Sequence, residues 1–285
     1  MLRKLIKYEW KGFYKMGLIL LGVVVFATLL GFLASRSPLW SDVRVYDSFA
    51  AGLATTISVF SIILYIILLA GTVYAMLIYT AVRFYRTMYT DEGYLLHTLP
   101  VTKHQILISK LLVSSIWLLI TYIVMFASVF SFIMFIMEAV SPGSVGQMMA
   151  YLPGLFDELW RELGYMSGKD RVELAYMITS MFLSLLVSIP AGIITIFGAI
   201  SLGQLFSKHR VLMAILCYVG INIVMSIISN VIRSISYTGI YLYDYEEGLG
   251  YLLTFLNSTL VKGLLEGVGF YLLSYFITSR KLNME

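Results

Sequence analysis

Long apolar stretches, separated by short polar connections, recur along the whole chain. A bilayer core is about 30 Å thick and a helix rises about 1.5 Å per residue, so one crossing needs about 20 mainly apolar residues. No stretch shows the alternation of apolar and polar residues that marks a membrane β-strand. The pattern predicts an all-α, polytopic membrane protein with six transmembrane helices, within residues 17–34, 51–81, 106–137, 176–206, 211–232 and 251–279.

Residues 1–16 have a different pattern, in which apolar and basic side chains occupy different faces of a helix. The basic residues lie largely away from the apolar face, which carries Leu2, Leu5, Ile6, Trp10 and Phe13. This pattern is typical of an amphipathic helix that lies in the membrane interface. A signal peptide is disfavoured, because the apolar run of residues 17–34 is longer than a usual signal core and lacks a convincing cleavage site.

Details within and between the spans predict departures from straight crossings. Pro190 and Gly192 predict a kink in the fourth span. The sixth run would overshoot a core of about 30 Å, so residues 251–260 are expected to form an outer re-entrant segment. Residues 145–163 carry apolar side chains at helical spacing and predict an external helix on the membrane surface. This helix packs against the outer helix ends or contacts substrate, and packing is favoured.

Connections that contain lysine and arginine alternate along the chain with connections that are mixed in charge or acidic. The basic segments are residues 1–16, the connection of residues 82–104, the turn of residues 208–210 and the tail after residue 279. The connections between these segments are mixed in charge or acidic. Because basic connections stay in the cytoplasm, both termini are predicted to be cytoplasmic and residues 138–173 to be extracellular.

Composition agrees with a lipid environment and excludes several classes of function. Of 285 residues, 60% are hydrophobic and 13% are charged, which leaves too few polar groups to cover a soluble globule of this size. The net charge of +4 does not indicate nucleic acid binding, because the basic residues lie at membrane edges. Cys217 is the single cysteine, so no intrachain disulfide or cysteine-rich metal site is expected.

Signatures of catalysis are missing from the sequence. It contains no Walker A motif, no G-x-S-x-G elbow and no H-E-x-x-H motif. The histidines, His97, His104 and His209, show no metal-ligand spacing, and neither a metal nor a bound cofactor is expected in this chain. The chain is therefore not expected to be an enzyme by itself.

Two charged residues, Lys262 and Glu266, lie one helical turn apart in the last apolar run. Counted back from Arg280, they stand roughly 27 Å and 21 Å away along the helix axis, which places Lys262 near the outer surface. A structural ion pair and an outer gate or substrate contact both fit, and the structural pair is favoured. Gly263 and Gly267 form a G-x-x-x-G spacing that favours close helix packing.

The connection of residues 82–104 is more elaborate than a passive turn requires. Two acidic residues are followed by a bulky apolar cluster, which suits contact with a soluble partner that transmits force to the helices. The residues alone fit equally well a loop that rests on the lipid headgroups. The residues concerned are Asp91, Glu92, Tyr94, Leu95 and Leu96.

The third span is predicted to start sharply at Lys103. Thr102 and Gln105 match a capping box, in which each residue satisfies a backbone N–H of the other. Val101 and Ile106 stand at the spacing of a hydrophobic staple. Such local signals fix the first turn of a helix.

The run TDEGYLLHTLPVTK, residues 90–103, and the following Ser109 and Lys110 resemble the first cytoplasmic loop of permease subunits of Gram-positive type-2 ATP-binding-cassette exporters. The segments EGYL and TLPV are the specific part, and the resemblance covers the whole chain in layout. It implies that residues 1–285 form one permease domain and that residues 1–16 are its connecting helix. It also implies that residues 91–96 belong to a coupling helix that docks on a separate ATPase subunit.

The resemblance further implies an assembly in the plasma membrane of a bacterium. Two permeases, identical or different, would pair with two ATPase subunits, which bind ATP and Mg. Expected cargo is hydrophobic or amphipathic, such as an antimicrobial peptide, a lipid or a drug, as in antimicrobial peptide resistance. Residues 138–173 depart from better-known members, whose outer elaboration lies between the fifth and sixth spans. The alternative is a membrane protein without an ATPase, either a secondary transporter or a receptor or assembly subunit.

Overall fold

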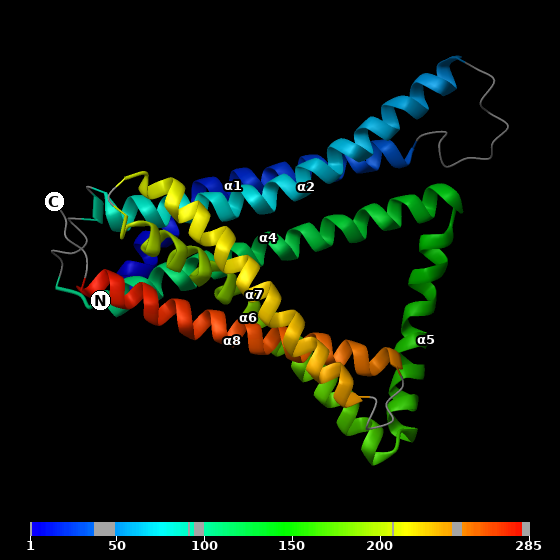
Figure 1. The fold of residues 1–285 in the computed structure, drawn as a ribbon. Coiled ribbons are helices and arrows are strands. Elements are labelled where there is room, and N and C mark those ends of the chain that lie inside the picture. Colours follow the sequence, from blue (N-terminus) through cyan, green and yellow to red (C-terminus); the bar gives the residue numbers. More distant parts are fainter. Residues whose placement is uncertain are drawn as a thin grey trace. The chain divides into compact units, whose positions relative to one another are not determined.

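The computed structural model of the chain describes residues 2–36, 49–90, 92–93, 100–206, 208–240 and 247–280. Within these residues every long element is an α-helix (Figure 1). The helices are α1 (Leu2–Ser35), α2 (Phe49–Tyr89), α4 (Lys103–Val140), α5 (Ser144–Tyr165), α6 (Gly168–Gly203), α7 (Arg210–Ile240) and α8 (Glu247–Arg280).

Six of these helices are long and apolar enough to cross a membrane among the residues described, all except α5. The prediction of an all-helical protein with six such helices is therefore confirmed. The orientation in the membrane and the cytoplasmic location of the termini stay predictions. The apolar faces of the helices remain widely exposed in the chain, as lipid-facing surfaces require.

Three boundaries differ from the predicted ones. The predicted interfacial helix and the first span form one uninterrupted helix, α1. Helix α2 continues to Tyr89, so residues 82–89 are helical rather than part of a loop. The predicted re-entrant segment at residues 251–260 is wrong, because α8 is a single helix from Glu247 onward. A helix longer than the hydrocarbon core can tilt or project from it, and a break is not required.

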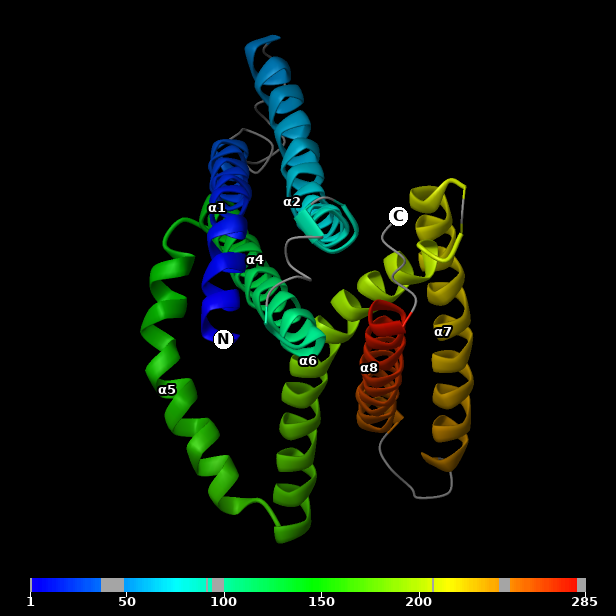
Figure 2. The same ribbon diagram turned by 90° about the vertical axis from the view of Figure 1, so that its left-hand side faces the viewer.

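Helix α6 remains helical through Pro190 and changes direction along its length, as Figure 2 shows. Proline removes one backbone hydrogen bond and is a common cause of kinks. Burial changes at the same point. Only Ser180 and Ser184 are buried before Pro190, whereas eleven of the thirteen residues from 191 to 203 are buried. The second half of α6 is thus surrounded by other helices.

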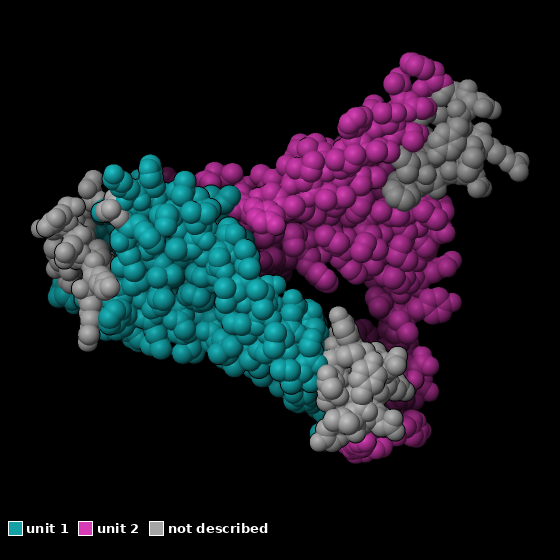
Figure 3. All heavy atoms as spheres, viewed as in Figure 1, with its two compact units in different colours: residues 1–13, 77–116, 172–285 teal, residues 14–76, 117–171 magenta. Residues whose placement is uncertain are grey.

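The chain divides into two compact units, which Figure 3 distinguishes by colour. Unit 1 contains Met1–Phe13, Leu77–Ile116 and Val172–Glu285, and unit 2 contains Tyr14–Met76 and Trp117–Arg171. Helices α1, α2 and α4 contribute segments to both units, so the same three helices are held together in two separate environments.

The core of unit 2 is apolar with a small polar centre. Val24, Ala27, Tyr65 and Leu69 are buried together, and Phe132 of α4 packs against them. In a second set of contacts, the Ser128 hydroxyl of α4 forms hydrogen bonds with Thr28 Oγ1 of α1 at 2.7 Å and with the Tyr65 hydroxyl of α2 at 3.2 Å. Three helices thus meet around one uncharged hydroxyl.

Helix α5 confirms the predicted helix at residues 145–163. The Glu138 carboxylate caps its start by accepting hydrogen bonds from the backbone N–H groups of Gly143 at 2.8 Å and Val145 at 3.1 Å. Gly143 has a φ of 85°, a backbone conformation that glycine adopts without strain. None of the residues of α5 is buried, so the structure does not show the packing against outer helix ends that the sequence favoured.

Candidate functional site: a buried charge network at the helix ends

A buried stripe runs along the first turns of α1 at intervals of four residues. Leu5, Glu9 and Phe13 are 8%, 3% and 2% exposed, whereas the lysines and arginine of the same segment point elsewhere. Positions four apart lie one above another on a helix. Glu9 therefore stands on the apolar face of α1, where a carboxylate requires a partner.

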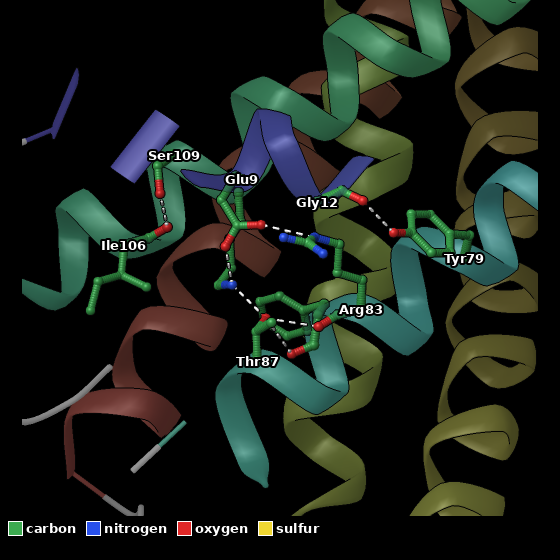
Figure 4. A network of polar contacts seen from close by, with 9 residues as sticks. Glu9, Gly12, Tyr79, Arg83, Thr87, Ile106 and Ser109 are labelled. Carbon is green, nitrogen blue, oxygen red and sulfur yellow. Dashed lines mark hydrogen bonds and ion pairs between the residues drawn. The ribbon is translucent and has the colours of Figure 1, made fainter. Parts of the chain in front are cut away.

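Two cations from different helices supply that partner (Figure 4). The Lys110 ammonium of α4 lies 2.6 Å from Glu9 Oε1, and the Arg83 Nε of α2 donates to Glu9 Oε2 at 3.0 Å. Lys110 also donates to the hydroxyl of Thr87, which in turn donates to the backbone carbonyl of Arg83 at 2.7 Å. Each oxygen of one carboxylate thus joins α1 to a different helix.

Aromatic side chains cover the network on its other side. The Tyr79 hydroxyl donates to the Gly12 carbonyl at 2.7 Å, and the Tyr79 ring meets Phe13 edge to face at 5.2 Å. The Arg83 guanidinium lies 5.3 Å above the Phe13 ring. A Cβ atom at Gly12 would overlap that guanidinium, so a larger residue there would require the Arg83 side chain to move.

The network strongly favours one arrangement of three helix segments. Removing one member of a buried ion pair leaves an uncompensated charge, which destabilises proteins by about 3–5 kcal/mol. Side-chain contacts that use both oxygens of Glu9 also fix the rotation of α1 about its axis. The contacts in this cluster are ion pairs and hydrogen bonds that join α1, α2 and α4.

The end of α2 is also bound to α6. Phe84 and Phe197 are both buried and stack with ring centroids 3.9 Å apart and planes 8° apart. One turn further, the hydroxyls of Tyr89 and Ser201 form a hydrogen bond of 2.7 Å. The last turns of α2, directly before residue 90, are therefore attached to the more buried half of α6.

The start of α4 is attached to the end of α8. Lys103 donates to the backbone carbonyl of Thr278 at 2.8 Å, and its positive charge suits the carbonyl end of a helix. His104 forms a hydrogen bond with the Tyr271 hydroxyl. The predicted helix start at Lys103 is confirmed, and the backbone N–H of Gln105 donates to Thr102 Oγ1 at 3.4 Å, which is one of the two hydrogen bonds of the predicted capping box.

Among the predicted docking residues, the structure describes Glu92 alone. Its carboxylate is about half exposed and lies 3.8 Å from Arg86, which is 66% exposed. A pair so open to solvent contributes little to stability. The other four docking residues, Asp91, Tyr94, Leu95 and Leu96, lie outside the described residues.

The structure brings Lys262 and Glu266 together on α8, with 3.7 Å between the ammonium nitrogen and a carboxylate oxygen. The two glycines beside them differ from each other. A Cβ at Gly263 would come within 2.9 Å of Val187, which marks close packing against α6. A Cβ at Gly267 would meet nothing within 4 Å among the described residues, so it has no such contact in this chain.

Sequence reasoning missed Glu9, Arg83 and Lys110 as a connected set. The signal for Glu9 was available, since it is the one acidic residue among the basic residues of the first segment and stands four positions from both Leu5 and Phe13. Its partners follow 74 and 101 residues later. A single sequence carries no signal that pairs residues over such separations.

Comparisons with family models, with curated proteins and with solved structures give no match. Within the described residues, no group of three or more histidine, cysteine, aspartate or glutamate side chains is arranged to hold a metal ion. Functional inference therefore rests on the geometry of this chain.

Proposed function

We propose that the chain is the permease subunit of an ATP-driven exporter of the bacterial plasma membrane, whose ATPase is a separate subunit docked at residues 91–96. Cargo would be hydrophobic or amphipathic, such as an antimicrobial peptide, a lipid or a drug. The resemblance of residues 90–103 to exporter permeases motivates this proposal, and the six apolar helices are compatible with it.

The observation that carries the proposal is the attachment of both ends of the connection at residues 90–102. On one side, the end of α2 is bound to α1 and α4 through Glu9 and to α6 through Phe197. On the other side, Lys103 is bound to the end of α8. A force applied to this connection would act on five helices through short, directional contacts, which is what a coupling element needs.

Co-purification with the ATP-binding protein encoded beside the chain tests the proposal. The tagged full-length chain is expected to retain the ATPase, and the double reversal Asp91→Lys with Glu92→Lys is expected to reduce the retained ATPase at least tenfold. Reversal places two positive charges where acidic groups are expected to meet basic residues of the partner. Failure of the native chain to retain any ATPase would overturn the proposal.

A matched control is available on α5, where Asp157 and Glu158 are adjacent acidic residues and both are exposed. The double reversal Asp157→Lys with Glu158→Lys makes the same charge change in unit 2 and is expected to leave ATPase binding unchanged. Equal loss of the ATPase in both reversals would point to a general charge effect and count against docking at residues 91–96.

One observation favours the alternative of a transporter without an ATPase. Glu266 is an ionisable residue with a side chain 10% exposed within a helix long enough to cross a membrane, and proton-coupled transporters use such groups. Transport by reconstituted vesicles separates the two functions. An ATPase-driven permease requires ATP and its partner, whereas a secondary transporter requires only an ion gradient.

A further inference from the structure

A cavity of about 210 Å³ with several polar side chains in its lining lies among α6, α7 and α8 in unit 1. It is lined by Ser188, Gly192 and Thr195 of α6, by Tyr218 and Asn222 of α7, and by Thr259, Lys262, Gly263 and Glu266 of α8. These helices are otherwise rich in apolar side chains. A concave site with a few convergent polar groups is a typical ligand site.

The cavity presents several hydrogen-bond acceptors. The hydroxyls of Ser188, Thr195 and Thr259 each donate to a backbone carbonyl of their own helix, at 3.3, 2.8 and 2.8 Å. Because each hydroxyl proton is already donated, these oxygens can only accept a hydrogen bond from a ligand. The amide group of Asn222 donates one of its two N–H groups to the Tyr218 carbonyl at 2.8 Å, and its side-chain carbonyl oxygen is a further acceptor.

Lys262 and Glu266, the two charged residues of the cavity, do not form a short hydrogen bond with each other. Their separation of 3.7 Å exceeds the length of about 2.7–2.9 Å that a charge-assisted hydrogen bond has. Glu266 is also the more deeply placed of the two, with a side chain 10% exposed against 32% for Lys262. The cavity therefore has a carboxylate among acceptor oxygens in its interior and an ammonium group nearer its opening.

We infer that this cavity binds a primary ammonium group that carries an anionic group a short distance away. The ligand ammonium would donate to Glu266 and to the oxygens of Thr259 and Asn222, and its anionic group would pair with Lys262. A volume of 210 Å³ corresponds to about seven water molecules in the liquid. This suits a headgroup such as phosphoethanolamine or the end of a short peptide. The inference stands independently of whether an ATPase drives the chain.

The test uses the purified full-length chain in phosphatidylcholine nanodiscs and two soluble probes, O-phosphoethanolamine and phosphocholine. Both carry the same phosphate, but the quaternary ammonium of phosphocholine has no N–H donor. Binding is measured by calorimetry and by the shift in the unfolding temperature. O-phosphoethanolamine is expected to bind and phosphocholine to bind at least tenfold more weakly. Equal binding of the two, or binding of neither, would overturn the inference.

Variants locate the probe in the cavity. Glu266→Gln is expected to weaken O-phosphoethanolamine binding at least tenfold, and Glu158→Gln, the same change on the exposed face of α5, to leave it unaltered. Gly192→Ala places a methyl group in open space within the cavity, since a Cβ there meets nothing within 4 Å. That variant is expected to fold at least as stably, because alanine favours a helix, and to bind more weakly. Undiminished binding in both cavity variants would contradict the site.

Two further arms identify the source of the ammonium group. Nanodiscs that contain phosphatidylethanolamine are expected to raise the unfolding temperature of the native chain above that of the Glu266→Gln chain if the ligand is a lipid. Trialanine, compared with N-acetyl-trialanine, tests a peptide amino terminus in the same way. A rise in either arm supports an ammonium site, and the absence of a rise in both arms contradicts it.

Discussion

Helices α1, α2 and α4 are joined twice, and the two junctions use opposite chemistry. In unit 1 they meet at Glu9, Arg83 and Lys110, which are charged and largely buried. In unit 2 they meet at Thr28, Tyr65 and Ser128, which are uncharged. Loss of one partner from a buried ion pair leaves a buried charge without a counter-charge, which is costly. Loss of a hydroxyl from the second junction leaves no buried charge and costs less. The same helices are thus fixed firmly beside the connection at residues 90–102 and held more lightly in unit 2.

The largest effect is expected from Glu9→Gln. This change leaves Lys110 and Arg83 as buried cations without a counter-charge, so the free energy of unfolding should fall by about 3–5 kcal/mol. Unfolding of the purified chain by SDS in mixed micelles measures the difference.

The double variant Glu9→Leu with Lys110→Met tests whether charge is the cause. Apolar replacement of a buried ion pair is often neutral, so this chain is expected to be more stable than the Glu9→Gln chain. Equal or lower stability would show that the shape of the Glu9 side chain matters more than its charge.

A smaller effect is expected from Ser128→Ala in unit 2. The change removes the hydrogen bonds to Thr28 and Tyr65, and such bonds between membrane helices average about 0.6 kcal/mol and reach about 1.7 kcal/mol. Ser131→Ala on the same helix is the control, because its hydroxyl donates to the Ala127 carbonyl of α4 itself. If Ser128→Ala destabilised the chain as much as Glu9→Gln, the contrast between the two junctions would be lost.

The smallest effect on stability is expected from Glu92→Gln. Its contact with Arg86 spans 3.8 Å between side chains that are more than half exposed, and pairs of this kind contribute about 0–1 kcal/mol. The same SDS titration should show no measurable change. A clear loss would reveal that Glu92 is part of the junction that Glu9 forms.

The parts of the fold that depend on local sequence could be predicted. Apolar runs of sufficient length defined six helices, and Thr102 with Gln105 defined the start of α4, because both signals lie within a few residues. The end of α2 could not be predicted in this way. Arg83 looked like a loop residue from its charge, but Glu9 neutralises that charge and the helix continues to Tyr89.

The polar sites depended on contacts between distant residues. Lys262 and Glu266 were recognisable as a pair because four positions separate them on one helix. Other acceptor oxygens of their cavity come from Ser188 and Thr195 of α6 and from Asn222 of α7, and nothing in the sequence of α8 indicates those residues. The partners of Glu9 could not be predicted for the same reason, because Arg83 and Lys110 lie on other helices, α2 and α4.

The contact between Lys103 and Thr278 has a consequence for the order in which the chain matures. The two residues are 175 positions apart, so at about 5–20 residues per second a ribosome needs roughly 9–35 s to make the second after the first. The partners Glu9 and Lys110 emerge long before that. A nascent chain can therefore bring α1, α2 and α4 together early, whereas the start of α4 gains its attachment to α8 only after Thr278 has been made. A chain truncated before Thr278 would lack this contact and leave the Lys103 ammonium without that carbonyl partner.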